Sequence, residues 1–433
     1  MKKIIIDKVY EILKDRCPVI LLRGNDAQAR VGGDIDFLVP FGKSNDASLW
    51  LIDALRLEGW RILSYRDIGY LSTFTIVLIT SEKTHSIKVD VFNGLSWRGL
   101  GSGHANHSFF EHLLATKNSD KDLSEFVAAV NFLHKSMYAG KLSERDILRL
   151  DCDWSAVKQL SDRLGWEVRE GSFPGGPGRL GQWSLRLRSA NLSSTLGVVN
   201  WVFNLVIMAV GSRFGSGFES GLALSLSGMD GSGKTTQFER MLSWYTSSGT
   251  APPRTIHFLP SWIPLPHQIF RRTKTVSNYT APYSEPPTSS WLSRAVRMAW
   301  YAVAFTFCKL YVNCLTKLGR VVFLDRSFVD LAADMDRVKI PHMDLREPLL
   351  NLFSLNGLNI YLDASPELAV ARKGELSLER AQLLQSRYIS IIEKIGGHRI
   401  NGSLSEDQVS AQILDLIDAQ FRSRLQAKVA KGI

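Results

Sequence analysis

The chain has 433 residues, 45% hydrophobic and 22% charged, which excludes a wholly disordered protein and predicts two or three globular domains. Its four cysteines are scattered without a C-x-x-C pair, which argues against a disulfide framework or structural zinc and fits a reducing, cytoplasmic location. Of the net charge of +10, +8 comes from residues 251–320, where nine basic residues accompany Glu285 alone. This segment indicates an anionic acceptor, the inner face of a membrane, nucleic acid (which we do not favour), or a solvated basic face.

The first chemical signal lies in residues 19–40, which read as an apolar strand, a loop and a second strand carrying D-x-D. Residues two apart in a strand share a face, so Asp34 and Asp36 would project together, and Mg²⁺ would relieve their repulsion. Residues 85–94 predict a half-buried neighbouring strand that supplies Asp90 as a third carboxylate. The competing interpretation is an acidic turn between strands.

This pattern resembles the polymerase-β-like nucleotidyltransferase superfamily over about the first hundred residues. The resemblance implies a Mg²⁺-dependent transfer of a nucleoside monophosphate to a hydroxyl. In it Asp34 and Asp36 would hold two metals, and Asp90 would help to activate the hydroxyl. Further positions implied to approach the triphosphate are Arg23, Gly24, Arg30 and Gly33.

The middle of the chain predicts helices over 104–190, interrupted by a hairpin within 166–188, and then an uncharged stretch. Within it, 195–211 is long enough to span a membrane, but Asn200 and Asn204 favour a buried or membrane-surface helix. The expected domains are a nucleotidyltransferase-like domain, a helical extension, an apolar connector and a P-loop domain, over 1–103, 104–190, 191–217 and 218–433.

The strongest signal is GMDGSGKTT at 228–236, directly after the apolar strand 222–227 and before a helix over 236–245. The spacing G-x-x-x-x-G-K-T predicts a phosphate-binding loop whose backbone N–H groups cradle a triphosphate. Lys234 would reach the β- and γ-phosphates of ATP or another nucleoside triphosphate, and Thr235 would ligate Mg²⁺. The predicted nucleotide-binding residues are Gly228, Asp230, Gly231, Ser232, Gly233, Lys234, Thr235 and Thr236.

Strands alternate with helices beyond this loop, which predicts a parallel sheet covered on both faces. The segments are a strand ending in Asp325-Arg326, a strand and helix over 359–377, a helix over 383–392, and a strand and helix over 398–417. The apolar run 300–315 predicts a buried helix against this sheet.

These features resemble the thymidylate kinase-like P-loop kinases over roughly residues 218–420, in a variant associated with bacterial surface-polysaccharide loci. The resemblance implies that Asp325 orients the acceptor or a metal, that Arg326 clamps an acceptor phosphate, and that Arg372 neutralises charge on the transferring phosphoryl group. Lys373 falls with Arg372 in the lid position of the family. Arg380 and Arg387 are weaker lid or phosphate candidates, for which the alternative is a solvent-facing charge on a helix. The acceptor side departs from the family in the segment 252–272; candidates there are Pro253, Arg254, Trp262 and His257, the last predicted to be an ordinary loop histidine.

The sequence therefore predicts an α/β protein with a small mixed-sheet nucleotidyltransferase domain, a helical extension and a P-loop kinase domain. It would phosphorylate a small molecule, a glycan or a lipid-linked sugar, and transfer a nucleotide, in cell-surface polysaccharide biosynthesis. The alternatives are a defence or regulatory nucleotidyltransferase acting on tRNA or protein with a nucleotide-sensing P-loop, a thymidylate kinase, and a membrane-associated scaffold with decayed sites.

Overall fold

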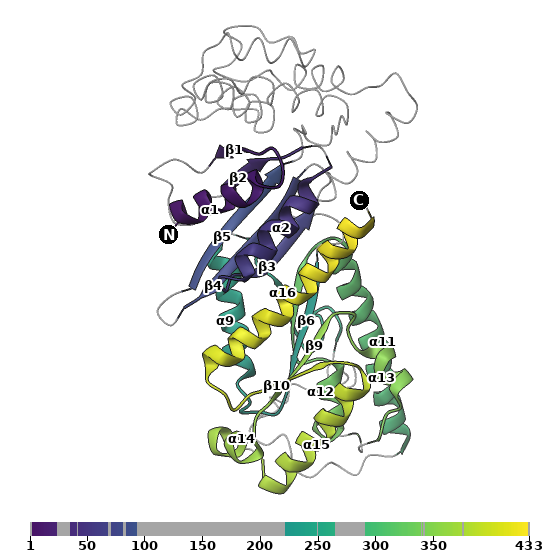
Figure 1. Cartoon of the computed structure of the whole chain (residues 1–433). Coiled ribbons are helices and arrows are strands. Elements are labelled where there is room, and N and C mark those ends of the chain that lie inside the picture. Colours follow the sequence, from purple (N-terminus) through teal and green to yellow (C-terminus); the bar gives the residue numbers. More distant parts are fainter. Residues whose placement is uncertain are drawn as a thin grey trace, which may run out of the picture. The chain divides into compact units, whose positions relative to one another are not determined.

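The computed structural model describes residues 2–23, 35–40, 42–67, 71–80, 84–92, 221–248, 250–264, 291–338, 340, 343–374 and 376–431. The chain divides into two compact units, Met1–Phe218 with Gln420–Ile433 (unit 1) and Glu219–Ala419 (unit 2) (Figure 1). The predicted helical extension, the hairpin and the apolar segment 195–211 lie outside the described residues.

Unit 1 contains a five-stranded mixed sheet in the order β1-β2-β5-β4-β3, as predicted for the N-terminal domain. Its strands are β1 (Ile20–Arg23), β2 (Ile35–Leu38), β3 (Arg61–Asp67), β4 (Leu71–Ile79) and β5 (Thr84–Phe92). Strands β2 and β5 run parallel, whereas the other pairs are antiparallel. Helix α1 (Lys2–Lys14) contacts α2 (Ser44–Arg56), which packs on β3, β4 and β5.

Unit 2 is built on an all-parallel five-stranded sheet in the order β10-β9-β6-β8-β7, as the alternation of strands and helices predicted. Its strands are β6 (Leu222–Ser227), β7 (Arg254–His257), β8 (Val321–Asp325), β9 (Leu358–Asp363) and β10 (His398–Asn401). Every residue of β6 and β9 is buried, as expected for the centre of a covered parallel sheet. All five strands point the same way, so their carboxyl ends form one edge, where α/β proteins bind ligands.

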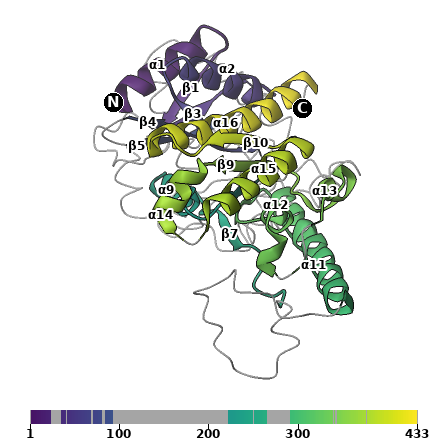
Figure 2. The same ribbon diagram turned by 90° about the horizontal axis from the view of Figure 1, so that it is seen from below.

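Helices pack around this sheet, as Figures 1 and 2 show. The long helix α11 (Trp291–Lys317) contacts β6 and β8, and α15 (Leu378–Lys394) contacts β9 and β10. The other helical elements of unit 2 are α9 (Lys234–Ser247), α12 (Phe328–Ala333), the 3₁₀ turn η1 (Met335–Val338), α13 (Glu347–Phe353) and α14 (Pro366–Lys373). The last helix, α16 (Glu406–Lys431), begins in unit 2, and its residues from Gln420 onward group with unit 1.

Helix α11 corrects one prediction. The run 300–315 is helical, but only one of its faces is buried. Phe305 and Cys308 lie in the core, whereas Val303, Phe307 and Leu310 are 48%, 53% and 54% exposed. An apolar sequence all round a helix does not reveal which side meets the sheet, so the sequence could not distinguish full from half burial. Among the described residues α11 alone is long and apolar enough to cross a membrane by length and composition, yet its inner face belongs to the core.

Candidate functional site at the carboxyl edge of the parallel sheet

The segment between β6 and α9 forms a loop shaped by three glycines. Gly228, Gly231 and Gly233 have φ values of 154°, 89° and 91°, which side chains with a Cβ rarely adopt. At Gly231, a Cβ would also lie 2.6 Å from the carbonyl oxygen of Ala369. Gly233 directly precedes the first turn of α9, so the unpaired N–H groups of that turn face the loop. The chain thus places a glycine-shaped loop and a helix N-terminus where the motif predicted a phosphate-binding loop.

Lys234 lies inside this loop and is 6% exposed. Its Nζ donates to the carbonyl oxygens of Gly228 at 2.6 Å and Met229 at 2.7 Å. Burial, together with the charge of Arg326, lowers the pKa of Lys234 to about 8. An ammonium has three N–H donors, so one remains for a phosphate oxygen.

Asp230 is the electrostatic centre of the loop. Its two carboxylate oxygens accept from Arg326 Nη2 at 2.5 Å and from Arg337 Nη1 at 2.8 Å. Burial alone would raise the pKa of Asp230, but the charges of Arg326, Lys234 and Arg337 outweigh burial and hold that pKa well below its usual range. The predicted nucleotide-binding Asp230 and the predicted catalytic Arg326 are therefore brought together, and Asp230 positions two guanidinium groups beside the phosphate cradle.

Asp330, which was not singled out from the sequence, anchors the start of the loop. One of its oxygens accepts from Ser227 Oγ at 2.7 Å and from the backbone N–H of Ser327 at 2.8 Å. The other accepts from Tyr388 Oη at 3.0 Å and from the backbone N–H of Gly228 at 3.3 Å. The signal that could have found it is Ser327-x-x-Asp330, which forms a capping box at the start of α12.

The hydroxyl groups of the loop fit a phosphate-bound Mg²⁺. Thr235 is exposed in the first turn of α9, and Ser232 Oγ is buried without a hydrogen-bond partner. No group of three or more His, Cys, Asp or Glu side chains among the described residues is arranged to hold a metal. Mg²⁺ is commonly bound by one or two protein oxygens together with substrate phosphates and water. Thr235 is the residue that would hold it; Thr236 is half-buried beside it.

Of the predicted phosphate-side cations, one reaches the loop. Arg372, at the end of α14, donates from Nη1 to the carbonyl oxygen of Gly231 at 3.2 Å. Arg380 instead donates to Asp334 at 3.0 Å and to Asp336 at 2.6 Å. The other two candidates do not contact the loop in this way. Arg387 lies 3.7 Å from Asp336, and Lys373 is exposed at the last position of α14.

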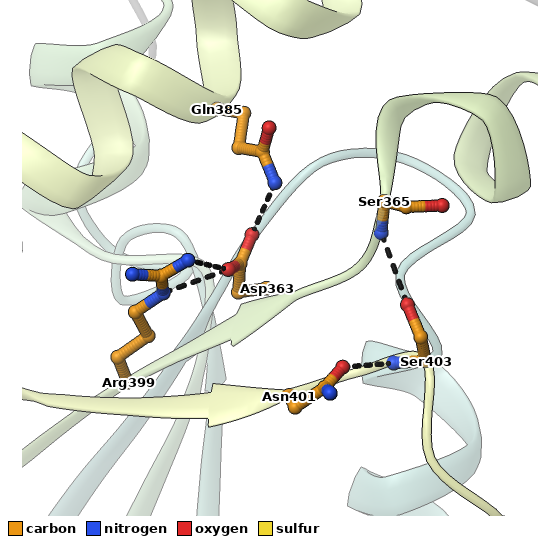
Figure 3. A pocket seen from close by; sticks show the side chains of 6 residues that line it. All are labelled: Asp363, Ser365, Gln385, Arg399, Asn401 and Ser403. Atoms are coloured by element: carbon orange, nitrogen blue, oxygen red, sulfur yellow. Dashed lines mark hydrogen bonds and ion pairs between the residues drawn. The ribbon is translucent and has the colours of Figure 1, made fainter.

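A cavity of about 420 Å³ opens beyond the ends of β9 and β10 (Figure 3). Asp363, the last residue of β9, accepts from Arg399 Nε and Gln385 Nε2, both at 2.7 Å. Gly402, which follows β10, lies beside the loop, because a Cβ there would be 3.2 Å from the carbonyl oxygen of Ser232. The remaining lining residues are Ser365, Asn401 and Ser403. No local motif marks this cavity; the signal that could indicate it is the position of its residues at the ends of parallel strands.

The opposite side of the loop carries a histidine–aspartate pair. His257 Nδ1 lies 2.9 Å from Asp325 Oδ2, and the two residues close β7 and β8 as register partners. The hydrogen bond from His257 is the main reason that the pKa of Asp325 is lowered. Asp325 ends β8, as the sequence predicts, and its partner is His257, which corrects the prediction that this histidine is an ordinary loop residue.

The other acceptor-side candidates do not join this pair. Arg254 begins β7, at the strand end opposite to the phosphate-binding loop. Trp262 is 57% exposed and packs edge-on against Tyr311, with ring centroids 5.8 Å apart. Pro253 is buried directly before β7.

In unit 1, the parallel pairing of β2 and β5 makes Asp36 and Asp90 register partners. Neighbouring strands lie about 4.8 Å apart, so these two carboxylates, each 7% exposed, lie on adjacent strands and on one face. Lys88 Nζ donates to Asp90 Oδ2 at 3.0 Å, whereas Asp90 Oδ1 is buried without a hydrogen-bond partner. Two neighbouring carboxylates, one of which has an oxygen that accepts no hydrogen bond, are suited to bind a divalent cation.

The remaining predicted residues of unit 1 are placed only in part. Arg23 is described in its backbone, as the register partner of Asp36 from β1. Asp34, Gly24, Arg30 and Gly33 lie outside the described residues.

No protein-family model matches the chain, and no curated protein matches its sequence. Among solved structures, a thymidylate kinase from Candida albicans is similar, with 18% identity, a TM-score of 0.34 and coverage of 47% of this chain and 93% of that one. A deoxyadenosine kinase from M. mycoides, solved with bound dATP, has 13% identity, a TM-score of 0.28 and coverage of 45% and 97%. Both identities are below 25% and both TM-scores are below 0.5, so neither match says what this chain binds or does.

Proposed function

We propose that unit 2 is a phosphotransferase that binds a nucleoside triphosphate with Mg²⁺ and transfers the γ-phosphoryl group to an acceptor. The observation that carries this proposal is the buried Lys234, held by two loop carbonyl groups inside a glycine-shaped anion cradle. A buried ammonium costs free energy unless it meets negative charge. Asp330, Asp230 and Asp325 supply part of that charge, but the pKa of Lys234 is still lowered, and a phosphate ligand would supply the rest.

The roles of the other residues follow from their positions. Lys234 and the N–H groups at the start of α9 would bind the β- and γ-phosphates. Arg326, fixed by Asp230, and Arg372, docked on Gly231, would face charge that develops on the transferring group. Thr235 would hold Mg²⁺, which supplies charge neutralisation at the phosphates.

The cavity at Asp363 is our candidate for the nucleoside part of the donor. It opens beside the loop and is lined by polar side chains that can both donate and accept hydrogen bonds (Figure 3). Its volume of about 420 Å³ lies in the range of small-ligand sites.

The test is transfer of label from γ-³²P-ATP with Mg²⁺ in a bacterial metabolite extract. Lys234→Ala should lower transfer at least about 100-fold, because it removes a preorganised donor from the transition state. The control is Lys317→Ala, at the exposed last position of α11, which should leave transfer unchanged. Equal transfer by wild type and Lys234→Ala would refute the proposal.

A second activity is favoured by the Asp36–Asp90 pair in unit 1. We propose that this pair binds Mg²⁺ and supports transfer of a nucleoside monophosphate, as the sequence resemblance implies. Label from α-³²P-ATP should then enter a product in wild type and in Lys234→Ala, but not in Asp36→Asn/Asp90→Asn. Absence of α-label transfer with all four nucleoside triphosphates would assign unit 1 to binding alone.

The pathway stays a prediction. A role in surface-polysaccharide synthesis, in which the kinase and the transferase act in sequence, rests on resemblance and on the two units sharing a chain. Recovery of bound RNA from the purified protein would instead favour the regulatory alternative, and rapid phosphorylation of dTMP would favour a thymidylate kinase.

Association with a membrane surface also stays a prediction, now supported by α11. This helix has four basic residues, no acidic residue and an exposed apolar stripe that includes Val303, Phe307 and Leu310. Sedimentation with anionic vesicles, which Phe307→Gln should weaken, would test it; equal sedimentation of both proteins would count against it.

A further inference from the structure

His257 and Asp325 form a dyad at the strand ends beside the phosphate-binding loop. Asp325 is the last residue of β8. Its register partner in β6 is Leu226, which precedes Gly228 of the loop by two residues. His257 closes β7 on the other side of Asp325. The dyad therefore stands next to the strand that leads into the cradle.

The backbone around the dyad is strained on both strands. Phe258 and Arg326, which directly follow His257 and Asp325, have φ values of 61° and 70° and are the two non-glycine residues with positive φ in the part of the chain that the structure describes. The Phe258 N–H donates to the Asp325 carbonyl oxygen at 2.9 Å, and the Arg326 N–H donates to Leu226 at 3.2 Å. Backbone strain of this kind concentrates where side chains must be aimed at a ligand.

The contact with Asp325 fixes the tautomer of His257. When Nδ1–H donates to the carboxylate, Nε2 is left as a proton acceptor. The His257 side chain is 72% exposed, so Nε2 is accessible to a second molecule. The charged groups that act on Asp325 besides His257 are Arg326 and Lys234.

In the described part of the chain, three arginines near the loop already have carboxylate partners, and a fourth, Arg372, is docked on Gly231, where it would face the transferring group. Arg326 and Arg337 both bind Asp230, and Arg380 binds Asp334 and Asp336. A phosphate-bearing acceptor needs cations whose charge is not already compensated, and it needs no base, because its attacking oxygen is ionised. A hydroxyl acceptor needs the opposite: little extra positive charge, and a base to take its proton.

We propose that the acceptor of unit 2 is a hydroxyl compound and that His257 is its general base, positioned by Asp325. This inference rests on the phosphotransferase function proposed above. As the acceptor oxygen bonds to the γ-phosphorus, the bond from that phosphorus to the β–γ bridging oxygen breaks. The hydroxyl proton passes to Nε2 of His257, and the nucleoside diphosphate leaves. The product is a phosphate monoester.

The experiment uses the full chain, γ-³²P-ATP, Mg²⁺ and a bacterial metabolite extract, and reads the bond that holds the label. Label in the monoester of a non-anomeric hydroxyl survives brief heating in acid, whereas label in a phosphoanhydride formed on a phosphate acceptor is released. We expect acid-stable label. His257→Gln should lower its rate about 100-fold or more and remove the fall in rate on the acidic side of the pH profile, with the KM for ATP unchanged.

The matched control is His398→Gln. His398 is an exposed histidine at the first position of β10, at the opposite strand end, and its substitution should leave rate and pH profile unchanged. Acid-labile label, or a His257→Gln enzyme with the wild-type pH profile, would overturn the inference. If no labelled metabolite forms, the same pH comparison is made on ATP hydrolysis, and a His257→Gln enzyme with the wild-type profile overturns the inference there too. Transfer that is insensitive to Lys234→Ala would instead refute the phosphotransferase proposal itself.

Discussion

The buried carboxylates of unit 2 and unit 1 differ in how far the protein supplies their hydrogen-bond and charge partners. At the P-loop, Asp230 binds two arginines and Asp330 accepts four hydrogen bonds, so each negative charge is compensated by the protein. In the mixed sheet, Asp36 and Asp90 stand on adjacent strands, and one oxygen of Asp90 has no partner. The first arrangement is satisfied within the protein, whereas the second leaves an acceptor for the cation proposed above. The same substitution, aspartate to asparagine, should therefore have opposite effects on stability in the two units.

The largest effect is expected for Asp230→Asn. It keeps the side-chain shape but leaves Arg326 and Arg337 without their shared counter-charge, and breaking such a pair costs about 3 kcal/mol. Because the two units need not unfold together, hydrogen exchange of β6 and β8 peptides is the appropriate measurement. Asp407→Asn, whose partner Arg240 lies on an exposed surface, is the matched control and should cost less than about 1 kcal/mol. Equal costs for both variants would contradict the idea of a preorganised centre.

An effect of comparable size should appear in the pH dependence of the stability of unit 2. Burial lowers the pKa of Lys234 from 10.5 to about 8, so the folded state bears a penalty of about 3 kcal/mol wherever the lysine is charged. Below pH 8 the penalty is constant. Between pH 8 and 10.5 the unfolded chain keeps a proton that the folded chain has lost, so the stability of unit 2 should rise with pH. Lys234→Met should lack this rise in nucleotide-free protein, and parallel curves for the two proteins would contradict it.

The contrast also explains what the sequence could predict. The P-loop, β6 and the position of Asp325 are local: a motif, an apolar run and a strand end define them. The pairing of Asp36 with Asp90 followed from two short strand patterns, because carboxylates that share a cation must be neighbours.

What the sequence missed depends on register between distant segments. His257 meets Asp325 only because β7 and β8 are parallel and in register, and Tyr388 reaches Asp330 only because α15 packs on α12. A local sequence pattern does not encode which distant residues come into register or into contact. A lone histidine before a proline-rich stretch therefore gives no sign of its partner. The half-exposed α11 was missed for the same reason, since its burial is decided by which side meets the sheet.

In unit 1, Asp90→Asn should stabilise the metal-free protein by about 1 kcal/mol, because it removes repulsion from Asp36 and costs only the contact with the partly exposed Lys88. Hydrogen exchange of β2 and β5 peptides in EDTA would show slower exchange than in wild type. Mg²⁺ should slow exchange in wild type and leave the variant unchanged. Faster exchange of the variant in EDTA would mean that Asp90 is a structural partner of Lys88 rather than half of a cation site.

The smallest effect separates these two roles of Asp90. Lys88 occupies one oxygen of the carboxylate that a cation would use, so the lysine and the metal compete for it. Lys88→Met should weaken metal-free unit 1 by about 0.5 kcal/mol and tighten Mg²⁺ binding by about threefold, since partly exposed ion pairs contribute little. Isothermal titration with Mg²⁺ in a Lys234→Ala, nucleotide-free background measures the second quantity. Weaker Mg²⁺ binding by Lys88→Met would show that the lysine orients Asp90 for the metal instead of competing with it.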